Sequence, residues 1–284
     1  MGKAEKHHYV PKGYLRFFAK EIKKNVVYHV AVYDKTTGKH FVSNIEDVAE
    51  QRKFNHINNE ISVVPTPDGN PLFYEELLSQ QIESIIPQII LNITAICTLS
   101  KQGTTVLEGE SKRQLIRFVL LQLMRTPKAR KYFTEIGKET FDSVMKETED
   151  LLLCLPESDS KKQMTSKLSE YAYSEELIKS ISLGILTDAK KLDRFADVVT
   201  TKRVWFILDN QDYLKRPFII SDEPVVMMNS GVNNMEFGVN ALDNPRTFLY
   251  MPLTPRFMVG SIHKDNFWGM NMGNMADKCI VLKN

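Results

Sequence analysis

Cysteine is scarce in this sequence. Its three cysteines, Cys97, Cys154 and Cys279, lie far apart among 284 residues. Their number and spacing argue against a disulfide framework and against a zinc site built from cysteine ligands. Such a sequence suits a reducing compartment, and we therefore expect a cytoplasmic protein.

The sequence also lacks an excess of charge of either sign. Its 37 Lys and Arg residues against 35 Asp and Glu residues give a formal net charge of +2, so the bulk charge predicts neither a nucleic-acid nor a membrane partner. The charge is unevenly distributed, however, because residues 1–25 and residues 110–139 each carry a net charge of +5. These basic segments would create one local positive field if they met in space. Two solvated helix faces are the alternative.

Targeting and membrane-spanning segments are missing as well. The opening MGKAEKHHYV has no apolar stretch of the kind that a secretory signal needs, and Lys6 stands where a myristoylation motif requires Ser or Thr. The most apolar run, Ile85 to Leu99, is too short to span a bilayer and is broken by Pro87 and two polar residues. We expect a buried helix there and no membrane partner.

The common catalytic motifs are absent too. The sequence has no Walker loop and no GxGxxG, GxSxG, HExxH or CxxC motif. This counts against the common nucleotide hydrolases, dinucleotide oxidoreductases, serine hydrolases and zincins.

The pattern of apolar residues predicts an α+β fold and a single domain over residues 1–284. β-branched and aromatic residues on both sides of a glycine-containing turn predict a hairpin over residues 25–44. Apolar residues at three- and four-residue steps predict a helical middle over residues 74–200, and short β-type runs make residues 203–284 rich in strands. We expect a central helical bundle packed with mostly antiparallel strands from the two terminal thirds, which could share one sheet.

Several local boundaries follow from the same patterns. Pro11 suits the first turn of a short helix. We expect two consecutive long helices over residues 109–132 and 133–155, an irregular segment over residues 45–59 and a β-type run at residues 217–220.

The most unusual stretch is the opening block His7-His8-Tyr9-Val10-Pro11, which Tyr14-Leu15-Arg16-Phe17-Phe18 follows. A histidine can serve as a neutral metal ligand or carry a proton near pH 7. Neighbouring side chains in extended backbone point to opposite sides, so one site would use only one of His7 and His8 while the other packs or caps. A histidine-rich terminus without a role is the alternative.

Polar residues form a stripe along the expected helix over residues 113–130. At 100° per residue the stripe covers an arc of about 140°. Its members are Gln114, Arg117, Gln122, Arg125 and Lys128. Because the rest of this helix is mostly apolar, the polar groups need partners or a water-filled cleft. Arginine suits phosphate or carboxylate, and an internal ion pair with Glu76 or Glu83 is the alternative.

An acidic corner, Ser221-Asp222-Glu223-Pro224, lies between two apolar runs. Pro224 holds Glu223 extended and interrupts any strand. Carboxylates at such a position can coordinate a divalent metal or act as a base. The alternative is a turn in which Ser221 or Asp222 binds local backbone amides. Phe54-Asn55-His56 adds a smaller polar cluster.

Four sequence blocks together resemble a bacterial and phage-associated family, domain of unknown function 4238. The blocks are the opening block with its aromatic continuation, Gln122-Leu-Met-Arg125-Thr126-Pro127 with Arg130, Ser221-Asp222-Glu223-Pro224-Val225, and Pro252-Leu253-Thr254-Pro255. They spread over nearly the whole chain, so the resemblance implies one module in which the blocks converge. It assigns no catalytic residue, since the family's activity is not established.

The leading hypothesis is a metal-dependent phosphodiester hydrolase, a nuclease of a bacterial or phage system. His7 or His8, Asp222 and Glu223 would activate water or hold Mg²⁺ or Mn²⁺, with Asp222 and His8 as metal ligands. Phosphate would be bound by Arg16, Arg117, Gln122, Arg125 and Asn55.

Two other classes stay open. One is a non-catalytic module that binds nucleic acid or a phosphate-bearing ligand through Arg16, Arg117 and Arg125. The other is a scaffold or interaction protein in which the conspicuous residues form a buried polar network. All three depend on the opening block, the arginine-bearing helix and the acidic corner lying close together.

Overall fold

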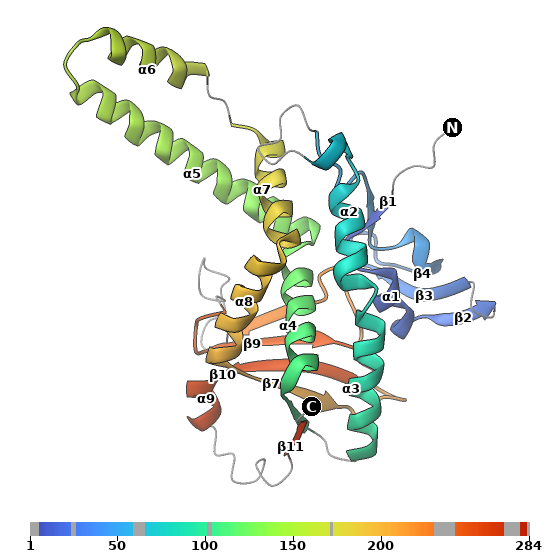
Figure 1. Cartoon of the computed structure of the whole chain (residues 1–284). Coiled ribbons are helices and arrows are strands. Elements are labelled where there is room, and N and C mark those ends of the chain that lie inside the picture. Colours follow the sequence, from blue (N-terminus) through green and yellow to red (C-terminus); the bar gives the residue numbers. More distant parts are fainter. Residues whose placement is uncertain are drawn as a thin grey trace.

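A computed structural model describes residues 6–23, 27–58, 66–100, 104–170, 173–229, 242–269 and 279–282 of the chain. It has the predicted α+β fold, in which a layer of helices packs against one large sheet and two small sheets extend from the N-terminal part (Figure 1).

The largest sheet has six strands in the order β11-β6-β7-β10-β9-β8. These strands are β6 (Thr104–Leu107), β7 (Arg203–Asp209), β8 (Val226–Asn229), β9 (Thr247–Pro252), β10 (Phe257–His263) and β11 (Cys279–Leu282). β11 runs parallel to β6, and the other neighbouring strands are antiparallel. Buried and half-buried residues alternate along β7 and β9, so one face of the sheet is turned toward the core.

Helices α4 (Gly109–Met124) and α8 (Ala189–Lys202) lie across that face, with α3 (Ile86–Ser100) beside α4 (Figure 1). Phe118 of α4 and Trp205 of β7 are fully buried in one apolar cluster that also includes Tyr14 near the N-terminus. Residues from both ends of the chain therefore share one core.

The N-terminal strands form two sheets of their own. β1 (Lys6–His8) pairs antiparallel with β5 (Glu50–Arg52). β2 (Lys20–Lys23), β3 (Val27–Asp34) and β4 (Lys39–Asn44) form an antiparallel sheet in that order. The predicted hairpin is confirmed, but a sheet shared by the two terminal thirds is wrong. β6 follows α3 directly and pairs with β7, so a strand from the helical middle takes the place we had considered for an N-terminal strand.

The predicted short helix after Pro11 is confirmed. It consists of α1 (Lys12–Leu15) and a 3₁₀ turn, η1 (Arg16–Phe18). Tyr14 is buried, its ring contacts Phe118 edge to face, and its hydroxyl donates a hydrogen bond to the Pro252 carbonyl. This tyrosine ties the opening block to both α4 and β9. The next segment is more regular than expected, since it contains the 3₁₀ turn η2 (Ile45–Asp47) and strand β5.

A π-helical turn interrupts the next helical stretch. After the short turn η3 (Pro67–Gly69), α2 (Phe73–Leu78) leads into η4 (Ser79–Glu83) and then α3. The N–H of Ser84 donates to the Ser79 carbonyl at 3.1 Å, a five-residue step. Because Pro87 has no N–H to donate to the Glu83 carbonyl, the regular ladder cannot continue through this point.

The break between the two long helices lies earlier than predicted. α4 ends at Met124, and α5 (Pro127–Cys154) begins after Arg125 and Thr126. The Thr126 hydroxyl accepts a hydrogen bond from the Ala129 N–H at 3.3 Å, and Pro127 occupies the first turn. A threonine cap followed by proline starts a new helix here, so our expected boundary at residue 132 was wrong.

The last helices complete the fold. They are α6 (Asp159–Glu170), α7 (Glu175–Thr187) and α9 (Lys264–Gly269). Figure 1 shows α5 and α6 projecting together from the body, and we call this helical pair the arm. Leu152 is the one buried side chain of α5, a helix whose residues are all described. None of the helices in the described ranges is long and apolar enough to cross a membrane.

Residues 217–220 do not form the predicted β-type run. The Phe218 N–H donates to the Pro255 carbonyl at 2.8 Å, and Ile219 is 79% exposed. Pro217 lacks an N–H, and this segment is fixed to the loop between β9 and β10 instead of joining a strand.

Candidate functional site

The opening block meets the junction between α4 and α5. Arg125, at the end of α4, is 1% exposed. Its Nη2 group donates to the backbone carbonyl of His8, and its Nη1 group donates to Glu83 in an ion pair. Glu83 lies on the π-helical turn before α3, so one guanidinium joins three segments. The internal ion pair that we had considered for the stripe is therefore present at Arg125.

Both histidines of the opening block are buried, with exposed fractions of 2% for His7 and 8% for His8. The Nε2 atom of His8 donates to the Ile45 carbonyl at 3.2 Å. Burial lowers the pKa of His8 below its ordinary value, because a low-dielectric environment disfavours the charged imidazolium. His8 therefore acts as a neutral hydrogen-bond donor inside the fold.

Asn55 binds the other histidine. Its backbone N–H donates to Nδ1 of His7 at 2.8 Å, and its side-chain Nδ2 donates to Glu75 at 2.6 Å. Its Oδ1 accepts a hydrogen bond of 3.0 Å from Nη2 of Arg130. Asn55 is 1% exposed, so these bonds satisfy a polar side chain that would be costly to bury alone.

Arg130 closes the network from the first turn of α5. Its guanidinium lies 3.6 Å from the Phe54 ring centroid and donates to the Phe54 carbonyl. Burial, together with the positive charge of Arg125, lowers the pKa of Arg130 to about 10. Burial likewise raises the pKa of Glu75, whereas its bond from Asn55 and the charge of Arg125 act in the opposite direction. We call these buried and half-buried residues the polar network: His7, His8, Asn55, Glu75, Glu83, Arg125 and Arg130.

The acidic corner lies next to the start of α5. Lys128 donates to Glu223 at 2.9 Å, and the negative charge of Asp222 adds to the effect of burial in raising the pKa of Tyr9. The corner therefore lies near Tyr9 of the opening block and near the start of α5, but the described hydrogen bonds of the His7 and His8 rings go to Asn55 and Ile45 and not to the corner. The corner itself is a turn: Ser221 donates to the Glu223 carbonyl at 2.7 Å and accepts from the Glu223 N–H at 3.2 Å. The alternative that we gave for this sequence thus describes its geometry.

Three other predicted residues lie apart from this junction. Arg117 forms an ion pair with Asp193 of α8. Gln122 is fully buried, and neither polar atom of its side chain has a hydrogen-bond partner among the described residues. Arg16 is exposed in η1, with its guanidinium 5.1 Å from the Tyr28 ring centroid. The stripe on α4 is therefore divided among separate environments.

Ion pairs neutralise part of the charge in both basic segments. In the first segment, Lys6 pairs with Asp47 and Glu50, and Lys12 pairs with Glu46. In the second segment Arg113 pairs with Asp197, Arg117 with Asp193, Arg125 with Glu83 and Lys128 with Glu223. In the first segment and the hairpin after it, Arg16, Lys20, Lys35 and Lys39 form no ion pair with any carboxylate in the described ranges. Unpaired positive charge therefore lies on the β2–β3–β4 sheet and the η1 turn before it, although Lys112 and Lys138 of the second segment also form no ion pair among the described residues.

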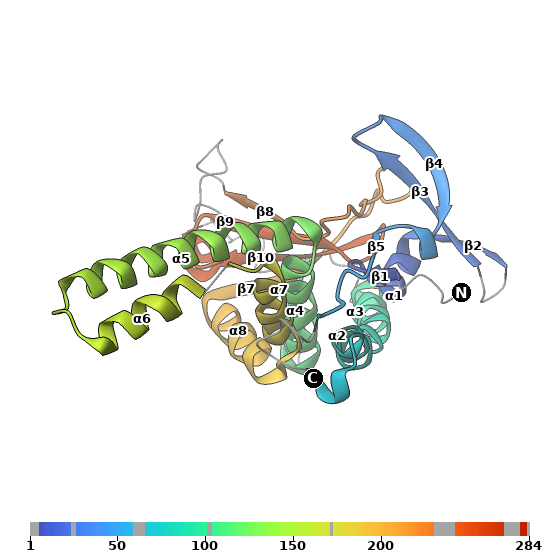
Figure 2. The same ribbon diagram turned by 90° about the horizontal axis from the view of Figure 1, so that it is seen from above.

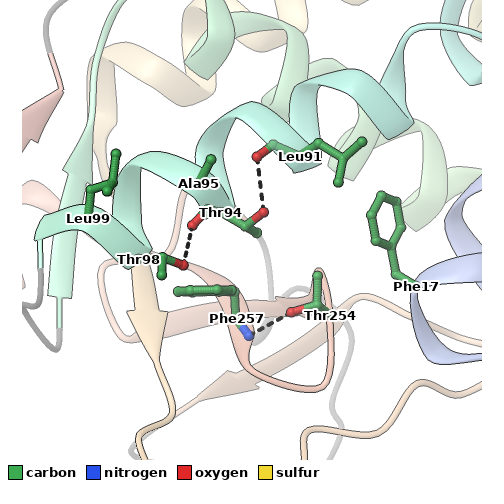
Figure 3. Close-up of a pocket in the computed structure, with 8 residues that line it drawn as sticks. All are labelled: Phe17, Leu91, Thr94, Ala95, Thr98, Leu99, Thr254 and Phe257. Carbon is green, nitrogen blue, oxygen red and sulfur yellow. Dashed lines mark hydrogen bonds between the residues drawn. The ribbon is translucent and has the colours of Figure 1, made fainter.

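A shallow groove of about 490 Å³ lies between α3, η1 and the loop after β9. Figure 3 shows its apolar wall, with Phe17, Leu91, Leu99 and Phe257 among the lining side chains. Its polar lining atoms bind the protein itself: the hydroxyls of Thr94 and Thr98 donate to helix carbonyls. The groove offers apolar contact and no chemical group that could act on a substrate.

Sequence reasoning missed two features. Glu75 was not a candidate, although its three-residue spacing from the buried Leu78 marks a side chain near an inner face. The exposed face of the β2–β3–β4 sheet was also overlooked. Its alternating aromatic and small residues were visible in the sequence, but only as evidence of a hairpin.

A divalent metal site with Asp222 and His8 as ligands would require their side-chain atoms to be free and close together. His8 directs its ring to a carbonyl, and Asp222 lies on an exposed turn. Within the described part of the chain, no three His, Cys, Asp or Glu side chains gather closely enough to hold a metal ion. The described residues do not fit the Mg²⁺ or Mn²⁺ site that we expected.

The structure is thus that of an α+β protein with a buried polar network where its opening block meets the helical layer. A family model described as "Protein of unknown function (DUF4238)" matches residues 6–265. The chain belongs to this family, and the resemblance of its sequence blocks is confirmed. No match was found among curated proteins or among solved structures.

Proposed function

We propose that this protein is a non-catalytic nucleic-acid-binding module and that the β2–β3–β4 sheet is its contact surface. The observation that carries the proposal is the unpaired positive charge of this sheet. Residues 16–44 include six basic and two acidic residues, a net charge of +4. Phosphate groups supply the complementary charge, and phosphate contacts dominate the affinity of most nucleic-acid-binding proteins.

The position of the sheet supports this role. Figure 2 shows the β3–β4 hairpin extending outward from the helices, on the side where β1 and α1 lie. Lys35 and Lys39 are at its tip, and both are exposed. One of the two acidic residues, Asp34, accepts hydrogen bonds from the backbone N–H and the hydroxyl of Thr37, so its carboxylate is engaged in forming the turn.

The polar network supports binding better than catalysis. His7, His8, Arg125 and Arg130 all have partners within the protein, and these partners join β1, the Asn55 segment and the helix junction. Such a network fixes how the N-terminal part docks on the body. In this proposal it supports the position of the sheet and does not contact the ligand.

Fluorescence anisotropy with labelled oligonucleotides tests the proposal. If Arg16, Lys20, Lys35 and Lys39 each contact a phosphate of a single strand, the logarithm of the association constant should fall with the logarithm of salt concentration with a slope of about −3. The triple variant Lys20→Glu/Lys35→Glu/Lys39→Glu should abolish binding at moderate salt.

A matched control distinguishes this sheet from net charge in general. Lys138→Glu/Lys146→Glu/Lys162→Glu changes the charge by the same amount on exposed positions of the arm. It should bind nucleic acid nearly as the parent does. Equal loss in both triple variants, or no binding to DNA or RNA at low salt, would contradict the proposal.

A further inference from the structure

We infer that the outer face of the β2–β3–β4 sheet binds single-stranded nucleic acid by stacking bases on the Tyr33–His40 pair. This inference rests on the proposed function and adds the form of the ligand and the residues that select it. Charge alone would accept a duplex as well as a single strand, whereas exposed ring faces require unpaired bases.

The strand register places the relevant side chains on one face. Tyr33 lies opposite His40, and Ala31 lies opposite Val42. Since residues two apart in a strand share a face, these four residues and His29 point to the same side. Lys20 of β2 lies opposite His29 and therefore joins them. We call this set the outer face: Lys20, His29, Ala31, Tyr33, His40 and Val42.

The two faces differ most near the body of the protein, since Phe41, on the opposite face near the hairpin tip, is itself 47% exposed. Tyr33 is 55% exposed and Val42 is 68% exposed. On the opposite side of β3, Tyr28 and Val30 pack against the main core. The outer face is therefore open to a ligand, whereas the other face is partly covered by the body of the protein.

The two rings already form a small stacking surface. Their centroids are 4.6 Å apart, and their planes are inclined by 26°. Stacking of one base on an aromatic side chain contributes a factor of about 5 to 150 in affinity and tolerates any base, because every base has a π face. Ala31 and Val42 next to the pair are short side chains that leave the ring edges accessible.

Positive charge borders both ends of this surface. Lys20 lies at the His29 end, and Lys35 and Lys39 lie at the hairpin tip beyond Tyr33. At about 3.3 Å per residue, His29 and Tyr33 are roughly 13 Å apart along the strand. A strand of nucleic acid running along β3 could thus stack bases on the rings while lysines at either end bind its phosphates.

Anisotropy titrations with labelled twelve-nucleotide oligo(dT) and oligo(U), and with a duplex of the same length, test the inference. The single strands should bind at least about fivefold more tightly than the duplex. Tyr33→Leu keeps an apolar side chain but removes the ring, and it should weaken single-strand binding at least about fivefold without changing the salt slope. Tyr33→Phe should bind as the parent does.

Controls separate this inference from the proposed function. Tyr132→Leu removes an exposed tyrosine of the arm and should have no effect. If the lysine triple variant loses binding but Tyr33→Leu keeps the parental affinity for single strands, the stacking inference is overturned and the proposed function stands. If no oligonucleotide binds at all, both are overturned.

A lipid surface is the competing use of a basic and aromatic face. Co-sedimentation with vesicles containing phosphatidylserine tests it with the same variants. Vesicle binding that Tyr33→Leu abolishes, together with oligonucleotide binding that this variant leaves unchanged, would overturn the inference. Far-UV circular dichroism of each variant checks that the sheet is still folded.

Discussion

Arg125 donates a hydrogen bond to the backbone carbonyl of His8, although 117 positions separate the two residues in the chain. A side chain at the end of α4 thereby holds β1 in place. The same guanidinium is paired with Glu83, so this ion pair contributes to the contact between the opening block and the helices.

We expect Arg125→Met to lower the free energy of unfolding by about 3 kcal/mol, because it leaves Glu83 and the His8 carbonyl without their donor. Urea denaturation measures this change. Arg125→Met/Glu83→Met should lose less than the single variant, since no unpaired charge remains. As a control, Arg113→Met breaks the exposed pair with Asp197 and should cost less than about 1 kcal/mol. Equal losses in the two single arginine variants would contradict this role.

Stability should also depend on the protonation of His8. Burial places the folded-state pKa of His8 below the ordinary value of 6.5, so the unfolded chain takes up a proton at a higher pH than the folded protein does. The contribution of His8 is fully present above about pH 6.5 and is lost as the pH falls toward the folded pKa. Urea midpoints between pH 7.5 and 5 should show this decline. The slope should be smaller in His8→Gln; an identical slope in the parent and in His8→Gln would contradict this role of His8.

The boundary between α4 and α5 should depend on the cap at Thr126. Thr126→Ala removes the acceptor for the Ala129 N–H and should cost about 1 kcal/mol, whereas Thr126→Ser retains the hydroxyl and most of the stability. Thermal unfolding followed by circular dichroism measures both. If the alanine and serine variants melt together, the hydroxyl does not stabilise the helix start.

Gly260 in β10 should not tolerate a larger residue. It lies directly opposite Phe206 of β7, and a Cβ atom at this position would come within 2.4 Å of the phenylalanine ring. Gly260→Ala should therefore destabilise the protein by about 1–3 kcal/mol. Phe206→Leu in the same chain should restore part of the lost free energy of unfolding, which urea denaturation measures. If Phe206→Leu restores nothing, contact with the Phe206 ring is not the cause of the loss.

Nucleic-acid binding should survive a chelator. The described residues offer no cluster of metal ligands, so EDTA and Asp222→Ala should leave the anisotropy titrations unchanged, as should the control Asp159→Ala on the arm. Gel analysis of RNA and DNA incubated with Mg²⁺ or Mn²⁺ is the complementary measurement. Cleavage that Asp222→Ala abolishes and Asp159→Ala does not would favour a hydrolase over the binding module proposed above.

The sequence predicted the helices and strands whose formation depends on residues close together in the chain. The β3–β4 hairpin follows from its turn and its β-branched residues, and the apolar run at residues 204–208 marks β7 in the sequence. The break at Thr126-Pro127 could also have been predicted, because threonine before proline is a typical helix start; the predicted helix over residues 109–132 ran through it instead. β6 has only four residues, and its existence depends on a partner about a hundred positions away.

For the candidate site, too, the sequence predicted some contacts and not others. The sequence predicted that the opening block, Arg125 and the acidic corner come together. An ion pair with Glu76 or Glu83 was the alternative for the arginine stripe, and Glu83 is the partner of Arg125. The sequence did not predict that Arg125 would also bind the His8 carbonyl, or that both histidines would be buried, because these contacts depend on how α3 and η2 pack. The stacked pair of Tyr33 and His40 required the strand register, which becomes known once the turn at Gly38 is placed.

Because few side chains of the arm are buried, its length should be able to change without affecting the rest of the fold. With Leu152 as the single buried side chain of α5, most of its far half is held by contact with α6 and not by the body. Removing or adding matched helical turns in α5 and α6 would change its reach by about 5.4 Å per turn while leaving the six-stranded sheet untouched. Insertions, deletions and fused tags should accordingly be accepted at its tip, near residues 155–158, more readily than anywhere beside the sheet.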